Sequence, residues 1–239
     1  MKTKILGKPL SNKVINKNIL EKIKRYKSSS KFGLDIWNIY DFMYLDNLKI
    51  PVLAVLEINI PSSSNFIIES KSMKLYLNSF YKKSFLNPSL VSNEIKNELE
   101  DLLNDEISVR FINKFSKEPN FFLINKSKAD FTPAKKILKF NGFRSICPVT
   151  SQPDFANIYI YSSKKIDLTW LKNYLVSFKD HGGFHEQCID QIFEKLSSFY
   201  ENFDFEICGR FQRRGGIDIN PVRGSIKKKL FFNFREFNQ

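Results

Sequence analysis

The sequence predicts an α+β protein made of two similar units, each an antiparallel sheet with helices on one face. The order of predicted elements is strands, two helices and strands, and it occurs twice along the 239 residues. A short repeat supports a duplication, since MKLYLNSF at 73–80 and LKNYLVSF at 171–178 share Lys, Tyr, Leu, Ser and Phe in the same places. An amphipathic helix can produce such a match by packing alone, but the shared order of elements favours duplication. We therefore expect two domains, at 1–115 and 116–239.

The first unit is predicted to begin with two strands and to end with a third. These segments, 35–45, 51–60 and 107–112, are rich in the β-branched and aromatic residues typical of strands. Between them, SMKLYLNSFY at 72–81 and VSNEIKNELEDLLN at 91–104 place apolar residues at helical spacing.

The second unit repeats this order with different residues. Its predicted strands and helices are RSICPV at 144–149, NIYIYS at 157–162, LTWLKNYLVSF at 168–178, FHEQCIDQIFEKLSSFY at 184–200, FEICGRF at 205–211 and KLFFNF at 229–234. The two long segments are helical because their Leu, Ile and Phe residues recur every three or four positions.

The composition predicts a globular cytoplasmic protein without a membrane segment. Hydrophobic residues make up 42% of the chain, which is enough to bury a large core. The leader MKTKILGKPLSNK lacks the apolar stretch of a secretory signal, and the apolar run at 51–60 is short and interrupted by Glu57. Three cysteines cannot all pair within one chain, so we expect reduced thiols, as in the cytosol.

The formal net charge of +13 permits a nucleic-acid partner, and KIKRYK at 22–27 and KKK at 227–229 fit that hypothesis. However, lysine is spread along the whole chain together with Ile, Asn and Phe, so a general compositional bias explains the charge as well. An anionic small ligand, such as a dinucleotide phosphate, would be attracted too. A basic RNA-binding module therefore stays an alternative.

One stretch, CPVTSQPD at 147–154, combines a thiol with a nearby acid. Pro148 and Pro153 restrict the backbone, so Cys147 and Asp154 can be held in a fixed relation. A thiolate attacks electrophilic carbon, and a protonated carboxyl can deliver a proton to the anion that results. The opposing interpretation, a buried thiol beside an ordinary turn aspartate, is about equally good from this stretch alone.

Two further acids lie at predicted helix starts. Glu69 follows an apolar strand-like run and precedes a helix, and Glu186 follows His185 at the start of another. Glu69 should therefore lie where a buried strand meets a helix, a place where ligands are often bound. The Glu186 carboxylate can accept two hydrogen bonds from an amidine-like edge, such as that of a guanine-type base. It can also simply complement the positive end of a helix, an effect of about 0.3–1 kcal/mol.

The run RRGGIDINP at 213–221 supplies two guanidinium groups and two flexible glycines, which suit phosphate groups. A basic turn is the alternative interpretation. No G-x-G-x-x-G follows a predicted strand, so a nicotinamide cofactor would not bind in a Rossmann fold.

A zinc site is the third alternative. His181, His185 and Cys188 have spacings compatible with metal ligands, and Cys147 would be a fourth. The glycine pair between the histidines argues against one helix presenting all of them, and Cys188 shares helical spacing with core residues. We therefore rank a metal site below a cysteine nucleophile and expect no metal.

Taken together, these stretches resemble the two-module form of the QueF family of NADPH-dependent 7-cyano-7-deazaguanine reductases. The matching segments, in the family's order, are DIWNIYDF, ESKSMKLYLNSF, FNGFRSICPVTSQPDF, SFKDHGGFHEQCID and RRGGIDINP. The resemblance implies a tunnelling fold (T-fold) in each unit and an active site where the two units meet. It also implies a homodimer, with no direct contact to nucleic acid or membrane.

The same resemblance implies a role for each candidate residue. Cys147 would add to the nitrile carbon and form a covalent thioimide, and Asp154 would donate a proton to the nitrile nitrogen. The residues implied to bind the deazaguanine substrate are Ile68, Glu69, Ser70, His185 and Glu186. Those implied to bind the cofactor NADPH are Ser70, Lys71, Arg214 and Gly215. Since nitrile to primary amine is a four-electron change, two hydrides are needed.

Overall fold

The computed structural model describes residues 17–26, 29–227 and 229–239. Its centre is an eight-stranded sheet in the order β5-β3-β2-β10-β9-β8-β7-β6. Its strands are β2 (Phe32–Leu45), β3 (Pro51–Pro61), β5 (Ser108–Ile112), β6 (Phe122–Leu123), β7 (Lys136–Ile146), β8 (Pro153–Ser162), β9 (Phe205–Phe211) and β10 (Ile217–Gly224). Neighbouring strands are antiparallel, except that β6 runs parallel to β7. The first residues of the chain, in which the sequence predicts no secretory signal, lie outside the described residues.

The predicted α+β class is confirmed, with helices against one face of the sheet. The helices are α1 (Ser70–Asn78), α2 (Pro88–Leu103), α3 (Leu168–Ser177) and α4 (His185–Phe199). We call β2, β3, α1, α2 and β5 the first module, and β7, β8, α3, α4, β9 and β10 the second. Their sheets are continuous, because β2 of the first module pairs with β10 of the second. The domain boundary at 115/116 stays a prediction.

Short elements complete the fold. Single 3-10 turns lie at Lys17–Ile19, Ser79–Lys82 and Phe178–Asp180, and the last two extend α1 and α3 in the same way. A separate two-stranded sheet joins β1 (Lys22–Lys24) to β4 (Phe66–Ile68), just before α1. Within the described ranges, no helix is long and apolar enough to cross a membrane.

Each module has its own hydrophobic core between its helices and the sheet. In α2, Val91, Ile95, Leu99 and Leu103 are buried at intervals of one helical turn, as the sequence pattern predicted. The buried side chains of the second core are arranged in the same way along α4. Truncating one such Leu or Ile to Ala costs about 2–5 kcal/mol, so these cores fix the positions at which α1 and α4 begin.

Two strand predictions need correction. The segment 229–234 is not a strand, because its apolar side chains pack across the sheet and its backbone is not paired along an edge: Phe231 and Phe234 are buried on the face opposite the helices. The predicted strand at 144–149 begins earlier and ends at Ile146, so Pro148 lies in the turn that follows. The strand β10 was missed because Pro221 and its polar neighbours disfavour a strand. Pro221 lies one residue beyond the part of β10 that pairs with β9.

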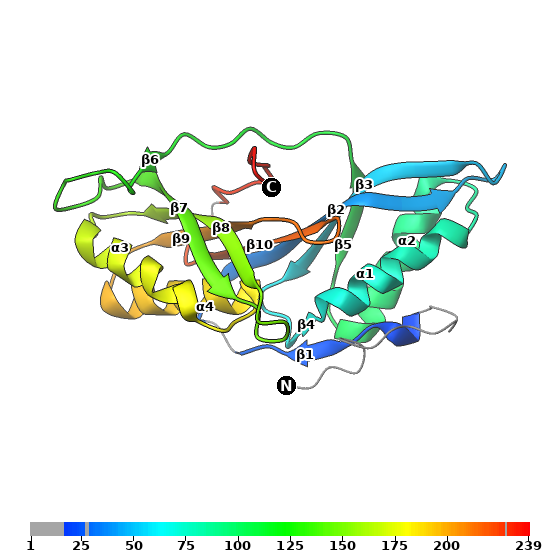
Figure 1. The fold of residues 1–239 in the computed structure, drawn as a ribbon, viewed down its shortest axis with the longest axis horizontal. Helices are drawn as coiled ribbons and strands as arrows, with labels where there is room; N and C mark the ends of the chain where they lie inside the picture. The colour runs from blue at the N-terminus through cyan, green and yellow to red at the C-terminus, as the bar shows by residue number, and fades with distance from the viewer. Residues whose placement is uncertain (1–16, 27–28, 228) are drawn as a thin grey trace.

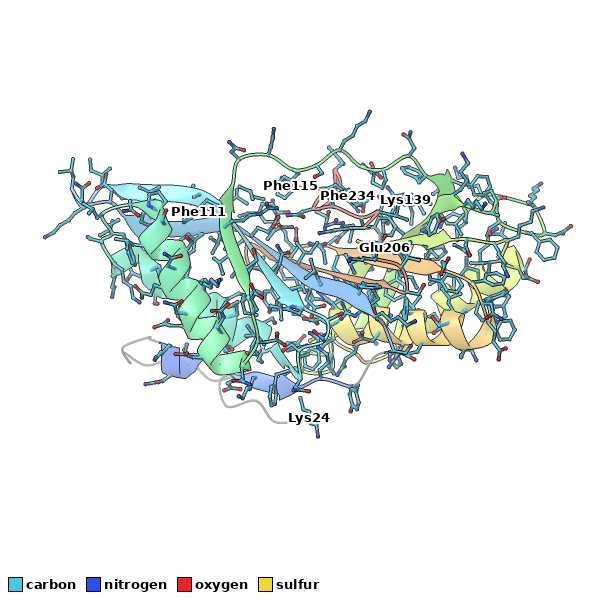
Figure 2. All side chains as sticks on the ribbon, turned by 180° about the vertical axis from the view of Figure 1, so that it is seen from behind. Lys24, Phe111, Phe115, Lys139, Glu206 and Phe234 are labelled. Carbon is cyan, nitrogen blue, oxygen red and sulfur yellow. The ribbon has the colours of Figure 1, made fainter. Side chains whose placement is uncertain are left out.

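The sheet face opposite the helices is polar and is covered by the C-terminal segment. Asn233 donates a hydrogen bond to Asn38 Oδ1 at 2.7 Å and is bonded to Glu57, which reaches this face from β3. Figure 2 shows Phe234 and Lys139 together on this side of the sheet. In Figure 1 the C-terminus and the β5–β6 linker lie along the top, while α4, β1 and β4 lie along the bottom. The C-terminal segment therefore covers the face away from the helices.

The junction between the modules is expected to be sensitive to a single methyl group. Gly33 in β2 pairs with Arg223 in β10, and a Cβ at Gly33 would collide with the backbone oxygen of Val222 and lie 2.7 Å from Ser62 Oγ. Because a backbone oxygen cannot move aside as a side chain can, Gly33→Ala should lower the free energy of unfolding by about 2–3 kcal/mol. Urea denaturation followed by circular dichroism measures this change.

The matched control is Gly182→Ala, where a Cβ would have no neighbour within 4 Å. This substitution should change the unfolding free energy by less than about 1 kcal/mol. Equal effects at the two glycines would contradict the tight junction.

Candidate active site

A cavity of about 270 Å³ lies between the first turns of α1 and α4, where the two modules meet. Its volume is near the lower end of small-molecule sites. The residues that line it are Ile68, Glu69, Ser70, Lys71, Lys74, Cys147, Pro148, Val149, Thr150, Gln152, Asp154, Phe184, His185, Glu186, Arg214, Ile217 and Ile219. All predicted site residues are among them except Gly215. Gly215 lines an adjoining hollow, which shares Lys74 and Ile217 with the cavity.

Glu69 is held as the N-cap of α1. Its Oε1 accepts from the backbone N–H of Lys71 at 3.0 Å and its Oε2 accepts from that of Ser72 at 2.7 Å. Its own N–H donates to the carbonyl oxygen of Glu21 at 2.8 Å, which ties it to the chain just before β1. An ionised carboxylate has about four acceptor positions, so each oxygen can still accept a hydrogen bond from a ligand. The predicted strand-to-helix position of Glu69 is confirmed.

His185 is the first residue of α4, and its ring is fixed from two sides. The ring stacks on Phe211 with centroids 3.9 Å apart, and its Nε2 lies 3.3 Å from Asp154 Oδ1. The Phe184 N–H donates to Gln187 Oε1 at 3.1 Å and secures the start of the helix. His185 is therefore one wall of the cavity and a direct neighbour of the predicted acid.

Glu186 is a buried acid of the cavity with a raised pKa. It is only 3% exposed. Burial, with a further contribution from the Asp35 carboxylate, raises the pKa of Glu186 to about 7, although His185 and Arg25 act in the opposite direction. A carboxyl group with this pKa changes charge near neutral pH, and ligand donors that offset its buried charge would favour the ionised form.

Cys147 and Asp154 belong to the hairpin between β7 and β8. The Cys147 N–H donates to the carbonyl of Gln152 at 2.9 Å, and the Ser151 N–H donates to the carbonyl of Cys147 at 3.0 Å, so the turn is closed on itself. Cys147 has a free, half-buried thiol, whereas Asp154 is 6% exposed. Pro153 is the first residue of β8 and Asp154 the second, so the start of the strand fixes the backbone position of Asp154. The turn aims both side chains at one cavity.

Cationic groups from α1 and from the segment before β10 also line the cavity. Arg214 approaches Asp154 Oδ1 to 2.8 Å and donates to Gln152 Oε1 at 2.9 Å. Lys71 and Lys74 come from α1, and burial together with the adjacent Arg214 lowers the pKa of Lys74. Such a set of cations beside a helix N-terminus fits the phosphate groups of a dinucleotide.

Lys74 and Gln152 were not predicted as site residues. Lys74 lies one helical turn after Ser70, so the helical spacing within ESKSMK could have placed both on the same face. Gln152 had no comparable signal, because its contact with Arg214 spans two distant parts of the chain.

The residues of the zinc hypothesis do not form a ligand cluster. In the described part of the chain, no group of three or more His, Cys, Asp and Glu side chains is arranged to hold a metal ion. Cys188 is fully buried with its Sγ 3.8 Å from the carbonyl oxygen of Gly183, and burial raises the pKa of its thiol to about 12. It serves as a core residue of α4.

The two halves of the chain match two family models. Residues 10–111 match "Nitrile reductase, 7-cyano-7-deazaguanine-reductase N-term", and residues 153–230 match "QueF-like protein". Proteins named NADPH-dependent 7-cyano-7-deazaguanine reductase are similar over nearly the full length. The one from Buchnera aphidicola is 33% identical over 93% of this chain and 97% of its own, and the one from Coxiella burnetii is 32% identical over 98% and 89%. That from Burkholderia vietnamiensis is 34% identical over 87% of this chain and 84% of its own. The chain therefore belongs to the QueF family of NADPH-dependent 7-cyano-7-deazaguanine reductases.

Proposed function

We propose that this protein uses NADPH to reduce the nitrile of 7-cyano-7-deazaguanine to a primary amine, as a step of tRNA queuosine biosynthesis. The observation that best supports this function is one cavity at the module junction. It combines a half-buried thiol, a buried acid, two carboxylates at helix starts and a set of cations. That the substrate is a nitrile and the hydride donor is NADPH is inferred from the family to which the chain belongs.

The base of the substrate would be recognised by carboxylates from both modules. Glu69 and Glu186 can each accept hydrogen bonds from the N1–H and 2-amino group of a deazaguanine. Ile217 and Ile219 of β10 offer an apolar floor, and Ile68, Ser70 and His185 line the sides. A guanine-like edge has the donors that these buried acceptors need, and a ligand without them would leave the acceptors unpaired.

The first chemical step is addition of the thiol across the nitrile. A bond forms between Cys147 Sγ and the nitrile carbon, one C–N π bond breaks, and the thiol proton ends on nitrogen, giving a thioimide. Asp154 can take the proton from sulfur and pass it to nitrogen, so the step is balanced without an external acid. His185 and Arg214 contact the Asp154 carboxylate and fix its direction.

The remaining steps add four electrons. NADPH, when bound, supplies a hydride to the thioimide carbon. The C–S bond then breaks, the thiolate of Cys147 is regenerated, and an imine remains. A second hydride and two protons in total complete the amine, so two NADPH are oxidised per nitrile. Ser70, Lys71, Arg214 and Gly215 would hold the cofactor, and Glu69 and Glu186 would keep the substrate in place while the cofactor is exchanged.

Turnover by the purified protein tests this function directly. With 7-cyano-7-deazaguanine present, we expect the loss of NADPH absorbance to stop at two equivalents per substrate, with the aminomethyl product seen by mass spectrometry. A sample without substrate gives the background oxidation. Salt-sensitive tRNA binding without NADPH oxidation would instead support the RNA-binding alternative.

The assembly is a separate expectation. We propose a homodimer that acts without direct contact to nucleic acid, as the family resemblance implies. Light scattering coupled to size-exclusion chromatography gives the molar mass, and a monomeric mass at micromolar concentration would contradict the dimer.

Substrate binding should depend on pH through Glu186. Since its pKa is raised to about 7, the group is largely protonated at pH 6, and one of its oxygens then carries a proton, so it no longer accepts both substrate hydrogen bonds. We expect the Kd of 7-cyano-7-deazaguanine, measured calorimetrically without NADPH, to rise about tenfold for each pH unit below 7. The Cys147→Ala background keeps the measurement free of covalent addition. Glu186→Gln should bind weakly at every pH; an unchanged pH profile in this variant would rule out Glu186 as the titrating group.

A further inference from the structure

A group of buried charges lies next to the candidate active site and joins the two modules. All members have side chains at most 7% exposed, and we call them the ion cluster: Arg25, Asp35, Asp190 and Arg223. Arg25 follows β1 and Asp35 lies in β2, so both belong to the N-terminal part of the chain. Asp190 lies in α4 and Arg223 in β10, both in the second module.

The ion cluster is closely connected. Arg223 Nη2 lies 2.8 Å from Asp35 Oδ1, and its Nε donates to Asp190 Oδ1 at 2.5 Å. Arg25 is paired with Asp35, and its Nη1 lies 3.9 Å from Asp190 Oδ2. Each guanidinium therefore contacts both carboxylates, and the two positive charges balance the two negative ones.

Stability alone is a weak reason for such a cluster. Removing ions from water costs several kcal/mol per ion, and well-packed apolar residues of similar volume are often equally stable or more so. Trp37 and Ile39 follow Asp35 at alternate positions of β2, on the same face of the strand, and they fill the core of the first module without charge. A role in specificity or positioning is therefore the better explanation for these charges.

The ion cluster acts on Glu186. Asp190 follows Glu186 by one turn of α4, and both residues are buried. The Asp35 carboxylate from β2 raises the pKa of Glu186, whereas Arg25 from the β1 segment lowers it. His185, on the same helix, also lowers it. The charge of Glu186 therefore depends on the cluster.

The ion cluster is also connected to Glu69, through β1. The N–H of Arg25 donates to the carbonyl of Asn65 at 2.8 Å, and its Nε donates to the carbonyl of Ser64 at 3.0 Å. The strand β1 then pairs along β4 up to Ile68, and the Glu69 N–H bonds to Glu21. A short, paired segment thus leads from the cluster to the other recognition carboxylate.

We propose that the ion cluster positions Glu186 relative to Glu69 across the module junction and sets the charge that Glu186 presents to the substrate. Its members are positioning residues, since they do not line the cavity. The inference rests on the proposed function, in which these two carboxylates recognise the base.

The test compares substitutions of opposite charge, again by calorimetric binding of 7-cyano-7-deazaguanine across pH in the Cys147→Ala background. Arg25→Met removes a cation, so the midpoint of the pH dependence should move up by about one unit and the Kd at pH 7 should rise several-fold to tenfold. Asp35→Asn removes an anion, so the midpoint should move down. The double substitution Arg25→Met with Asp35→Asn should return it toward the wild-type value.

Lys24→Met is the matched control. It removes the same charge from the neighbouring position, where Lys24 is exposed and points away from the body of the protein (Figure 2). The midpoint should not move in this variant. Midpoints that move in the same direction for Arg25→Met and Asp35→Asn, or as far in Lys24→Met, would overturn the inference.

Arg25→Lys covers the case in which Arg25→Met does not fold, as judged by thermal unfolding. It keeps the cation, but an ammonium group cannot contact both Asp35 and Asp190 as the guanidinium does. The Kd should therefore rise several-fold, while the midpoint of the pH dependence stays within a few tenths of a unit. An unchanged Kd would overturn the positioning role. If Cys147→Ala alone binds no substrate, the proposed function fails; if it binds but the cluster variants leave the midpoint unchanged, only this inference fails.

Discussion

Replacing Cys147 with alanine is expected to lower kcat/KM by at least about a thousandfold, because the carbon–sulfur bond of the thioimide can no longer form. Substrate should still bind, since the recognition carboxylates lie at the starts of α1 and α4 and not on the hairpin that carries the thiol. Steady-state NADPH oxidation gives the rate, and calorimetry gives the affinity.

Cys208→Ala provides the control for loss of a thiol. Cys208 is fully buried in β9 and packs with the apolar residues of the face opposite the helices. Its substitution should reduce stability slightly and leave kcat/KM within about twofold. Turnover that survives in Cys147→Ala would contradict covalent catalysis at this residue.

Replacing Asp154 with asparagine is expected to lower the rate of thioimide formation by about a hundredfold to ten-thousandfold. The substitution keeps the size of the side chain and one oxygen that can accept a hydrogen bond from Arg214, but an amide cannot carry the proton from sulfur to nitrogen. Rapid mixing with substrate in the absence of NADPH, followed by acid quench and mass spectrometry, measures the rate of adduct formation.

Asp180→Asn is a suitable control for the charge change. Asp180 is largely exposed and lies near the same end of the sheet, 3.3 Å from Arg144. Adduct formation should proceed at the normal rate in this variant. A normal rate in Asp154→Asn would mean that another group transfers the proton.

Local signals were sufficient for most of the fold. The apolar stripe of α2 and the β-branched run of β3 are patterns that one segment carries by itself, and both were predicted within a few residues. The failures have a common cause in tertiary context. The strand β10 contains Pro221 and polar residues that face the C-terminal segment, whereas 229–234 has a strand-like composition because Phe231 and Phe234 cover the sheet.

The same distinction applies to the site. Glu69 and His185 stand at helix starts that local sequence predicts, so their positions were accessible from the sequence. The burial of Arg25 was not, because KIKRYK looks like an exposed basic run and Arg25 finds its partners at Asp35 and Asp190 through the fold. This buried arginine is therefore unavailable to the nucleic-acid contact that the run had suggested.

Covalent catalysis by Cys147 is tested most directly by intact and peptide mass spectrometry of the protein incubated with 7-cyano-7-deazaguanine but without NADPH. Addition of a thiol to a nitrile loses no atoms, so we predict a mass increase equal to the whole substrate, located on the peptide that contains Cys147. The adduct should disappear when NADPH is added, with release of the amine. Reduction of the nitrile with no adduct on Cys147, or with the adduct on Cys188 or Cys208 instead, would contradict covalent catalysis by Cys147.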